Sequence, residues 1–133
     1  WYANYVGTAY KNNIVKGYPA RTFKPARTVN RAEFLKMLLT AMDIKLESEP
    51  GTDVYADVPG RAWHAPYVKY SKDKNLMDVM EGRFRPEEEM TRAEVAETIY
   101  RMIVLKLSGQ QRYSPELTVL NAKAQEFFGD RNG

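Results

Sequence analysis

Apolar positions at the start of the chain recur with the period of a helix. Five of them share one face through spacings of four residues and their neighbours: Trp1, Tyr5, Ala9, Val6 and Tyr10. A later stretch has the same spacing with a more polar end: Trp63, Tyr67, Ser71 and Val68. Both stretches therefore predict a helix with one apolar face.

Two further helices are predicted by their start signals. Glu33 follows Asn30 by three residues, and Glu94 follows Thr91 in the same way, so each pair is a capping box. Wide apolar faces come after both: Phe34, Leu35, Leu38, Leu39 and Met42, then Val95, Ala96, Ile99, Tyr100, Met102, Ile103 and Leu105. Helices this apolar are typically central and pack on more than one neighbour.

The two halves of the chain are copies of one another. Trp1–Val6 matches Trp63–Val68 at an offset of 62 residues, as Asn13-Ile14 matches Asn75-Leu76. Phe23–Pro25 matches Phe84–Pro86 at an offset of 61, as Asn30–Glu33 matches Thr91–Glu94. Four blocks in one order indicate an internal duplication.

Each copy is expected to form a helix, a loop and a second helix. Gly17, Pro19 and Pro25 interrupt the first loop, and we expect Phe23 and Phe84 to anchor the two loops to the core. The predicted units are repeat 1 (1–46), a linker (47–53), repeat 2 (54–107) and a tail (108–133). A Ser-Pro-Glu sequence at 114–116 predicts a short tail helix over about 115–128.

Composition excludes several classes of protein. The 133 residues are 44% hydrophobic and include 9 Tyr, which argues against disorder. No apolar run approaches the roughly 20 residues of a membrane span. The absence of Cys excludes disulfides and Cys-based zinc sites, and the single His64 argues against histidine-rich metal sites. Because the chain begins at Trp1 with no leader, we expect a fragment or a processed product.

Charge is distributed unevenly along the chain. Residues 1–45 carry a net charge of +6 and residues 46–60 a net charge of −4, while the whole chain has +3. The basic first third favours an anionic partner there, although a solvated basic surface explains the charge alone equally well.

Together these motifs resemble the S-layer homology domain, a bacterial module that holds exported proteins to cell-wall polysaccharide. Its repeats combine an aromatic-x-Asp-Val opening, a Trp in the first helix, an Asp-Gly-x-Phe-x-Pro turn and a Thr-Arg-Ala-Glu helix start. Repeat 2 carries Tyr55–Val58, Trp63, Glu81–Pro86 and Thr91–Glu94. Repeat 1 carries Trp1, Gly17–Pro19, Phe23–Pro25 and Asn30–Glu33, but Ala20-Arg21 replaces the usual Asp-Gly.

The resemblance implies an all-α fold. In the expected fold, tandem helix-loop-helix repeats pack around a central helix bundle. A C-terminal helix follows the second repeat. Three repeats commonly form one unit in this family, whereas two occur here. A third repeat upstream, the tail helix or a second chain would complete the bundle.

The resemblance also implies a polymer-binding site in grooves between repeats. The residues carried over are Arg31, Arg92, Trp1, Trp63, Asp57, Gly17 and Gly82. Repeat 2 has Val79 in place of the glycine at position 17 of repeat 1, which departs from the family pattern.

The two arginines lie in the first turn of a helix, where the macrodipole disfavours a cation by about 0.3–1 kcal/mol. One explanation is that Arg31 and Arg92, with the helix amides, receive the carboxylate of a pyruvylated sugar. The alternative is that each pairs with a neighbouring acidic residue or lies on an aromatic ring. We expect the two Trp side chains to be partly buried groove walls, although Trp on an apolar face is also a core residue. Turn formation explains the aspartate and the glycines equally well.

We therefore expect a non-catalytic module that anchors an extracellular protein to an anionic, pyruvylated secondary cell-wall polysaccharide. Other envelope proteins or a second copy are further candidate partners, and no cofactor or metal is expected. An enzyme is disfavoured because Glu33 and Glu94 are better explained as capping residues. Nucleic acid is disfavoured because the basic charges are dispersed. The alternative function is an assembly module in a surface layer or envelope complex that does not bind glycan.

Overall fold

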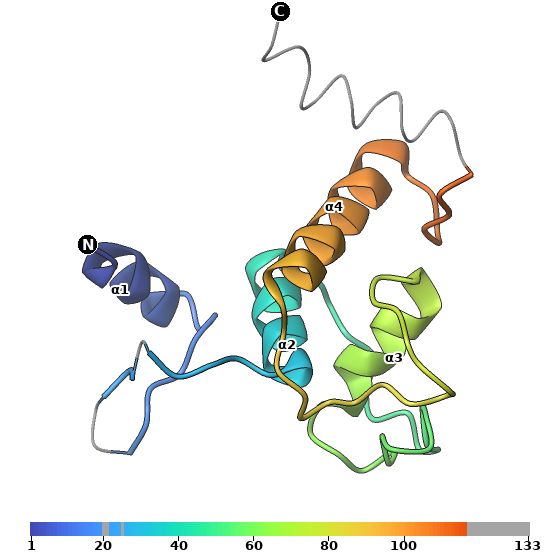
Figure 1. Cartoon of the computed structure of the whole chain (residues 1–133), viewed down its shortest axis with the longest axis horizontal. Coiled ribbons are helices and arrows are strands. Elements are labelled where there is room, and N and C mark those ends of the chain that lie inside the picture. Colours follow the sequence, from blue (N-terminus) through green and yellow to red (C-terminus); the bar gives the residue numbers. More distant parts are fainter. Residues whose placement is uncertain (20–21, 25, 117–133) are drawn as a thin grey trace, which may run out of the picture.

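The computed structural model describes residues 1–19, 22–24 and 26–116 (Figure 1). It contains the helices α1 (Ala3–Lys11), α2 (Arg31–Ala41), α3 (Ala65–Lys74) and α4 (Arg92–Ser108). The described residues form isolated β-bridges but no strand, so the expected all-α fold is confirmed. Apart from its first two positions, the predicted tail helix lies outside the described residues.

The core lies between α2, α3, α4 and the loops that join them. Its most deeply buried apolar side chains are Leu35, Leu39, Val58, Val68, Leu76, Phe84 and Val104. Removing each of these from water stabilises the fold by roughly 1.5–3 kcal/mol. Since α2 belongs to repeat 1 and packs on α3 of repeat 2, the core forms across the boundary between the repeats.

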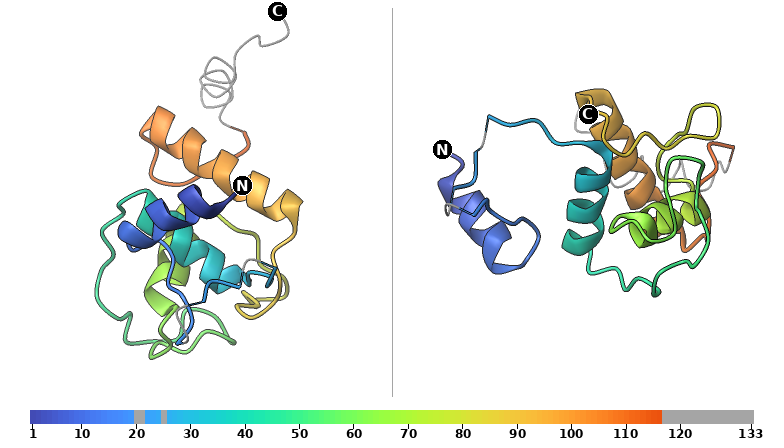
Figure 2. Two further views of the ribbon diagram at one scale, coloured as in Figure 1. Left: turned by 90° about the vertical axis from the view of Figure 1, so that its left-hand side faces the viewer. Right: turned by 90° about the horizontal axis from the view of Figure 1, so that it is seen from below.

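Helix α1 stands apart from the other three helices (Figure 2). None of its residues is buried, and Trp1 before it is 98% exposed. Our expectation of a partly buried Trp1 is therefore wrong. In its counterpart Trp63, the ring is contacted by Lys36 of α2. No described helix packs against Trp1.

The two loop phenylalanines also differ in burial. Phe84 is 1% exposed and stacks on Tyr55 with 6.3 Å between ring centroids, so it anchors its loop as expected. Phe23 is 37% exposed, and the same expectation is wrong for it. Both the first helix and the loop of repeat 1 are thus less covered than those of repeat 2.

The two capping boxes form to different extents. Asn30 accepts from the amide of Glu33 at 2.8 Å, and Glu33 accepts from the amide of Asn30 at 3.2 Å, which completes the first box. Thr91 accepts from the amide of Glu94 at 3.1 Å, but the reciprocal bond is not formed. The reason is that the Glu94 carboxylate is turned toward Arg31.

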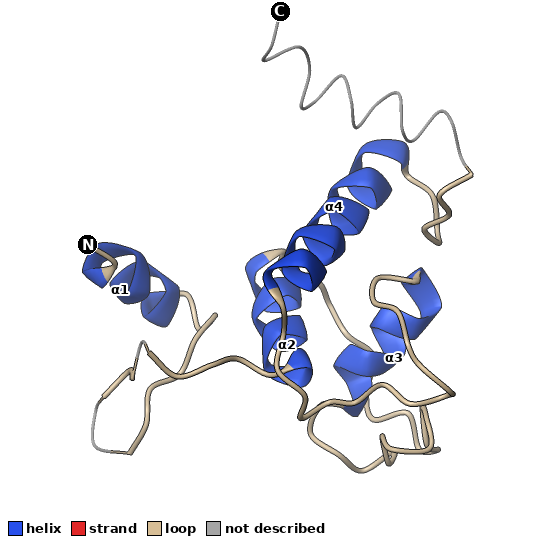
Figure 3. Ribbon diagram, viewed as in Figure 1, coloured by secondary structure: helices blue, strands red, loops and turns tan. Residues whose placement is uncertain are grey.

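The segments that lead into α2 and α4 lie side by side (Figure 3). The amide of Met90 donates to the carbonyl of Val29 at 3.0 Å, and the amide of Arg31 donates to the carbonyl of Glu88 at 2.9 Å. The amide of Ala32 donates to the carbonyl of Pro86 at 3.0 Å. The first-turn amides of α2 are therefore already occupied by protein acceptors.

Candidate functional site

A groove of about 360 Å³ lies between repeat 1 and the start of repeat 2. The loop at residues 14–29 and one face of α2 form most of it, and Trp63 closes it from repeat 2. Four cationic side chains line the groove: Lys16, Lys24, Arg27 and Lys36. Glu33 is the acidic side chain among its lining residues. The groove is therefore cationic and is built at the boundary between repeats.

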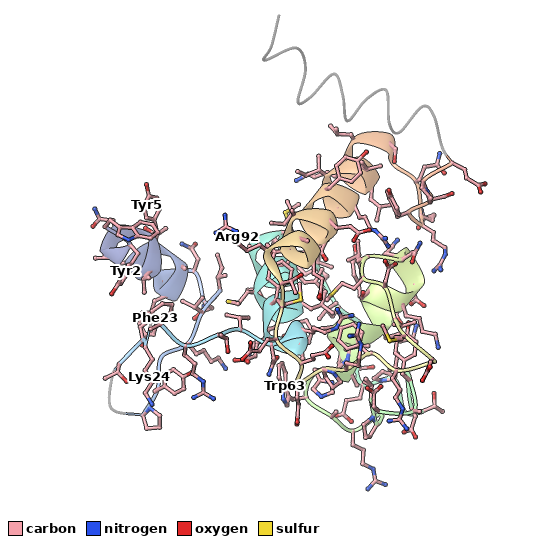
Figure 4. The ribbon with its side chains drawn as sticks, in the orientation of Figure 1. Tyr2, Tyr5, Phe23, Lys24, Trp63 and Arg92 are labelled. Carbon is pink, nitrogen blue, oxygen red and sulfur yellow. The ribbon has the colours of Figure 1, made fainter. Side chains whose placement is uncertain are left out.

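Two aromatic rings, Tyr18 and Trp63, stand next to three of these cations. Figure 4 labels Lys24 and Trp63. Lys24 Nζ lies 4.4 Å from the Tyr18 ring centroid, and Arg27 Cζ lies 5.2 Å from it. Lys36 Nζ lies 5.6 Å from the Trp63 ring, which is 55% exposed. An exposed aromatic face beside a positive charge suits a ligand with an apolar ring face and an anionic substituent.

Lys36 interacts with a second groove cation, Lys16. Burial lowers the pKa of Lys36, and the positive charge of Lys16 lowers it further. Two like charges held close together destabilise one another unless an anion lies between them. The groove is thus electrostatically suited to receive a negative group.

Arg31 is 2% exposed and joins the two repeats. Its Nε donates to the Phe84 carbonyl at 2.8 Å, and its Nη2 donates to the Asp78 carbonyl at 2.7 Å. Its Nη1 forms an ion pair with Glu94 at 2.6 Å, and its guanidinium lies 4.9 Å from the Phe84 ring centroid. Of the two explanations for this arginine, the pairing with an acidic residue and an aromatic ring is the one observed.

Arg92 occupies the same place in repeat 2 but not the same environment. It is exposed, and it forms no hydrogen bond or ion pair within the described part of the chain. The two arginines of one repeated motif therefore differ: one is saturated by protein groups, and the other is open to a partner.

Asp57 organises the turn that Arg31 contacts. Its carboxylate accepts from the amides of Phe84 at 2.9 Å and Arg85 at 2.7 Å. Burial alone would raise the pKa of Asp57, but these amides outweigh it and hold the pKa below its usual value. Gly82 in the same turn has φ +70°, which L side chains rarely adopt.

Gly17 is required for a different reason. A Cβ at this position would lie 2.9 Å from the carbonyl oxygen of Thr22, which pairs with the amide of Tyr18 at 2.8 Å. The glycine thus allows two backbone segments of the repeat 1 loop to approach closely.

The structure separates the residues that the sequence grouped. Trp63 lies at the cationic groove, whereas Asp57 and Gly82 lie at the turn held by Arg31. Trp1 and Arg92 lie on neither of these. The four groove cations were not singled out in the sequence, although the net charge of +6 over residues 1–45 was the signal for them.

The described residues contain no cluster of three His, Asp or Glu side chains that could hold a metal ion. Among the same residues, no helix has the length and hydrophobicity needed to cross a membrane.

The S-layer homology domain model matches residues 1–35 and 54–96, which are most of the two repeats. The chain belongs to the S-layer homology family. This family consists of non-catalytic modules that anchor proteins at the bacterial cell envelope, so the chain is an anchoring module of a cell-surface protein.

Curated proteins with similar segments include an anchoring protein, a surface glycoprotein and an enzyme. A cellulosome-anchoring protein of Acetivibrio thermocellus is 31% identical over 102 residues, which are 73% of this chain and 22% of that protein. Cell surface glycoprotein 1 of the same organism is 30% identical over 110 residues, 79% of this chain and 5% of that protein. An endo-1,4-beta-xylanase A of Thermoanaerobacterium saccharolyticum is 27% identical over 97 residues, 73% of this chain and 8% of that protein. The chain thus spans less than a quarter of each of these relatives.

Proposed function

We propose that the cationic groove binds an anionic, pyruvylated cell-wall polysaccharide and so attaches the parent protein noncovalently to the wall. The observation that carries this proposal is the convergence of four cations and exposed aromatic rings in one groove between repeats. Family membership supports the wall as the partner. The module itself carries out no reaction in this proposal.

The groove chemistry matches a pyruvate ketal. Such a ketal presents a carboxylate on a sugar ring, and ammonium and guanidinium groups form charge-assisted hydrogen bonds with carboxylates. A carboxylate near Lys16 and Lys36 would reverse their mutual repulsion. The face of Trp63 would lie against the sugar ring beside it.

In this proposal Arg31 is a positioning residue. It fixes the turn of repeat 2 against α2 without touching the polymer. An external carboxylate at Arg31 would have to displace Glu94 from a partly buried ion pair. Arg92 is exposed and stays a predicted carboxylate receiver, which an Arg92→Ala variant tests when it is added to the wall-binding experiment.

Sedimentation with purified, protein-free cell walls tests the proposal. We expect Lys16→Ala/Lys36→Ala to weaken binding by roughly tenfold or more, since each charge-assisted bond contributes about 1.5–3 kcal/mol. The matched control is Lys45→Ala/Lys106→Ala, which removes the same charge from exposed positions outside the groove. Wild-type binding should also fall with added salt.

Walls with the pyruvyl groups removed provide the second comparison. Loss of wild-type binding to these walls would support the ketal carboxylate as the ligand. Equal binding of the groove variant and the control variant would refute the groove as the site. If the wild type binds neither kind of wall, the polysaccharide proposal itself fails.

A further inference from the structure

The interface between α2 and repeat 2 can be compared with the corresponding positions of α4 and α1, because the two repeats align residue by residue. Helix α2 buries four residues: Arg31, Ala32, Leu35 and Leu39. At the offset of 61 residues, the first three correspond to Arg92, Ala93 and Ala96 of α4. All three of these counterparts are exposed. The fourth, Leu39, corresponds to Tyr100, which is half-buried against the core. The start of α4 therefore leaves exposed the positions that the start of α2 buries against repeat 2.

The other half of the interface is uncovered at the opposite end of the chain. Helix α3 buries Ala65, Val68 and Ser71, which correspond to Ala3, Val6 and Ala9 of α1 at the offset of 62 residues. None of the α1 counterparts is buried. Around them lie the exposed aromatic side chains of repeat 1: Trp1, Tyr2, Tyr5, Tyr10 and Phe23. One chain thus carries both halves of an interface that it forms only once internally.

The acceptors of Arg31 indicate which groups Arg92 would bind in an equivalent contact. Its counterpart Arg31 binds the Phe84 carbonyl and the Glu94 carboxylate of the following repeat. The corresponding acceptors are the carbonyl of Phe23 and the carboxylate of Glu33, both in repeat 1. Glu33 uses Oε1 in its capping box, and Oε2 accepts no hydrogen bond within the described part of the chain.

We propose that a second copy of this chain docks its α1 and first loop on α4, as α3 and its loop dock on α2. Arg92 then donates to the Phe23 carbonyl and the Glu33 carboxylate of the other copy. Two chains that exchange this contact reciprocally form a closed dimer with twofold symmetry.

Charge favours this pairing. The α1 end belongs to the segment 1–45 with net charge +6. The α4 end begins with three consecutive exposed acidic residues at 87–89, and Glu97 on α4 is also exposed. Opposite charges on two docking surfaces raise the association rate and disfavour pairing of like ends. Phe23 and Glu33 also line the cationic groove, so a docked second copy and a bound polysaccharide would share this loop, and the two proposals are tested by separate measurements.

Sedimentation equilibrium of the full chain tests the proposal. We expect the mass to rise from monomer to dimer with concentration, and Arg92→Ala to raise the dimer dissociation constant by roughly ten- to a hundredfold. Arg61→Ala is the matched control, because Arg61 is also exposed and lies outside both surfaces. A wild type that stays monomeric throughout, or an Arg92→Ala variant that dimerises like the control, would overturn the proposal.

Mixing two defective chains tests the direction of the contact. Ala96→Glu places a charge on the α4 surface, and Val6→Glu places one on the α1 surface; neither position is buried, so both chains should keep their helical circular dichroism. Each variant alone retains two damaged contacts and should be monomeric. A one-to-one mixture can form one intact α4–α1 contact and should recover dimers. Failure of the mixture to dimerise would overturn the head-to-tail arrangement, as would dimers of either variant alone.

Discussion

Arg31 is a buried cation whose energy depends on every acceptor around it. Two carbonyls and one carboxylate surround its guanidinium, and together they offset the cost of removing the charge from water. Arg92 faces no such cost because it is exposed. The motif alone does not distinguish these environments, since the acceptors of Arg31 lie 47–63 residues away in the sequence.

This difference predicts unequal effects of two identical substitutions. We expect Arg31→Ala to lower the free energy of unfolding by about 2–4 kcal/mol, because it removes three hydrogen bonds of a buried guanidinium and leaves the buried Phe84 carbonyl unpaired. Arg92→Ala is the matched control and should change it by about 0.5 kcal/mol or less. Urea unfolding followed by circular dichroism, at a protein concentration that keeps the chain monomeric, measures both. Equal losses for the two variants would contradict the assignment of Arg31 as the joint between repeats.

Asp57 predicts an acid-dependent contribution to stability. The pKa of Asp57 is below its unfolded value, so its contribution is complete above the unfolded pKa of about 3.9 and is lost as pH falls through the folded pKa. Asp57→Asn removes the titration and one charge-assisted acceptor. We therefore expect the variant to be less stable than wild type at neutral pH and the two to converge below about pH 4. Urea midpoints measured across this range check the prediction, and a constant difference at all pH values would argue against it.

At the scale of elements, the repeat made the helices predictable, but not which elements pack on their apolar faces. A period of 3.6 residues shows that a helix has an apolar face, not what lies against that face. The spacing in α1 and α3 is the same, yet α3 packs on α2 and α1 has no buried residue. The second capping box failed for a similar reason, because a distant arginine competes for Glu94.

The two first helices should therefore differ in amide exchange. We expect amides of α1 to exchange with little protection at low protein concentration, because few packed side chains oppose its opening. Amides of α3 should exchange through global unfolding, since Val68 and its neighbours lie in the core. Hydrogen–deuterium exchange followed by mass spectrometry measures the contrast. Equal protection of α1 and α3 in dilute solution would show that α1 packs more firmly than its burial indicates.

At the scale of the whole molecule, the groove combines residues that the sequence presents separately. Lys16, Lys24 and Arg27 come from a loop, Lys36 comes from α2, and Trp63 comes from the other repeat. The basic excess of residues 1–45 indicated an anionic partner, but a charge count does not show whether cations converge. Trp63 was identified because the repeat marked it. Lys16 and Lys36 were not, because Asp78 and Glu97 stand at the corresponding positions of repeat 2.

The groove predicts how wall binding depends on alkaline pH. Burial and then the charge of Lys16 lower the pKa of Lys36, so it loses its proton at a lower pH than an ordinary lysine. A bound carboxylate raises that pKa, which means that the complex holds the proton more firmly than the free groove does. Affinity should therefore be full below the free-state pKa of Lys36 and fall as pH rises through it. Lys36→Arg keeps its charge in this range and should retain affinity to higher pH. Binding of both proteins to pyruvylated walls is measured up to the pH at which their circular dichroism begins to change. Superimposable pH profiles for wild type and Lys36→Arg would mean that Lys36 does not contact the anion.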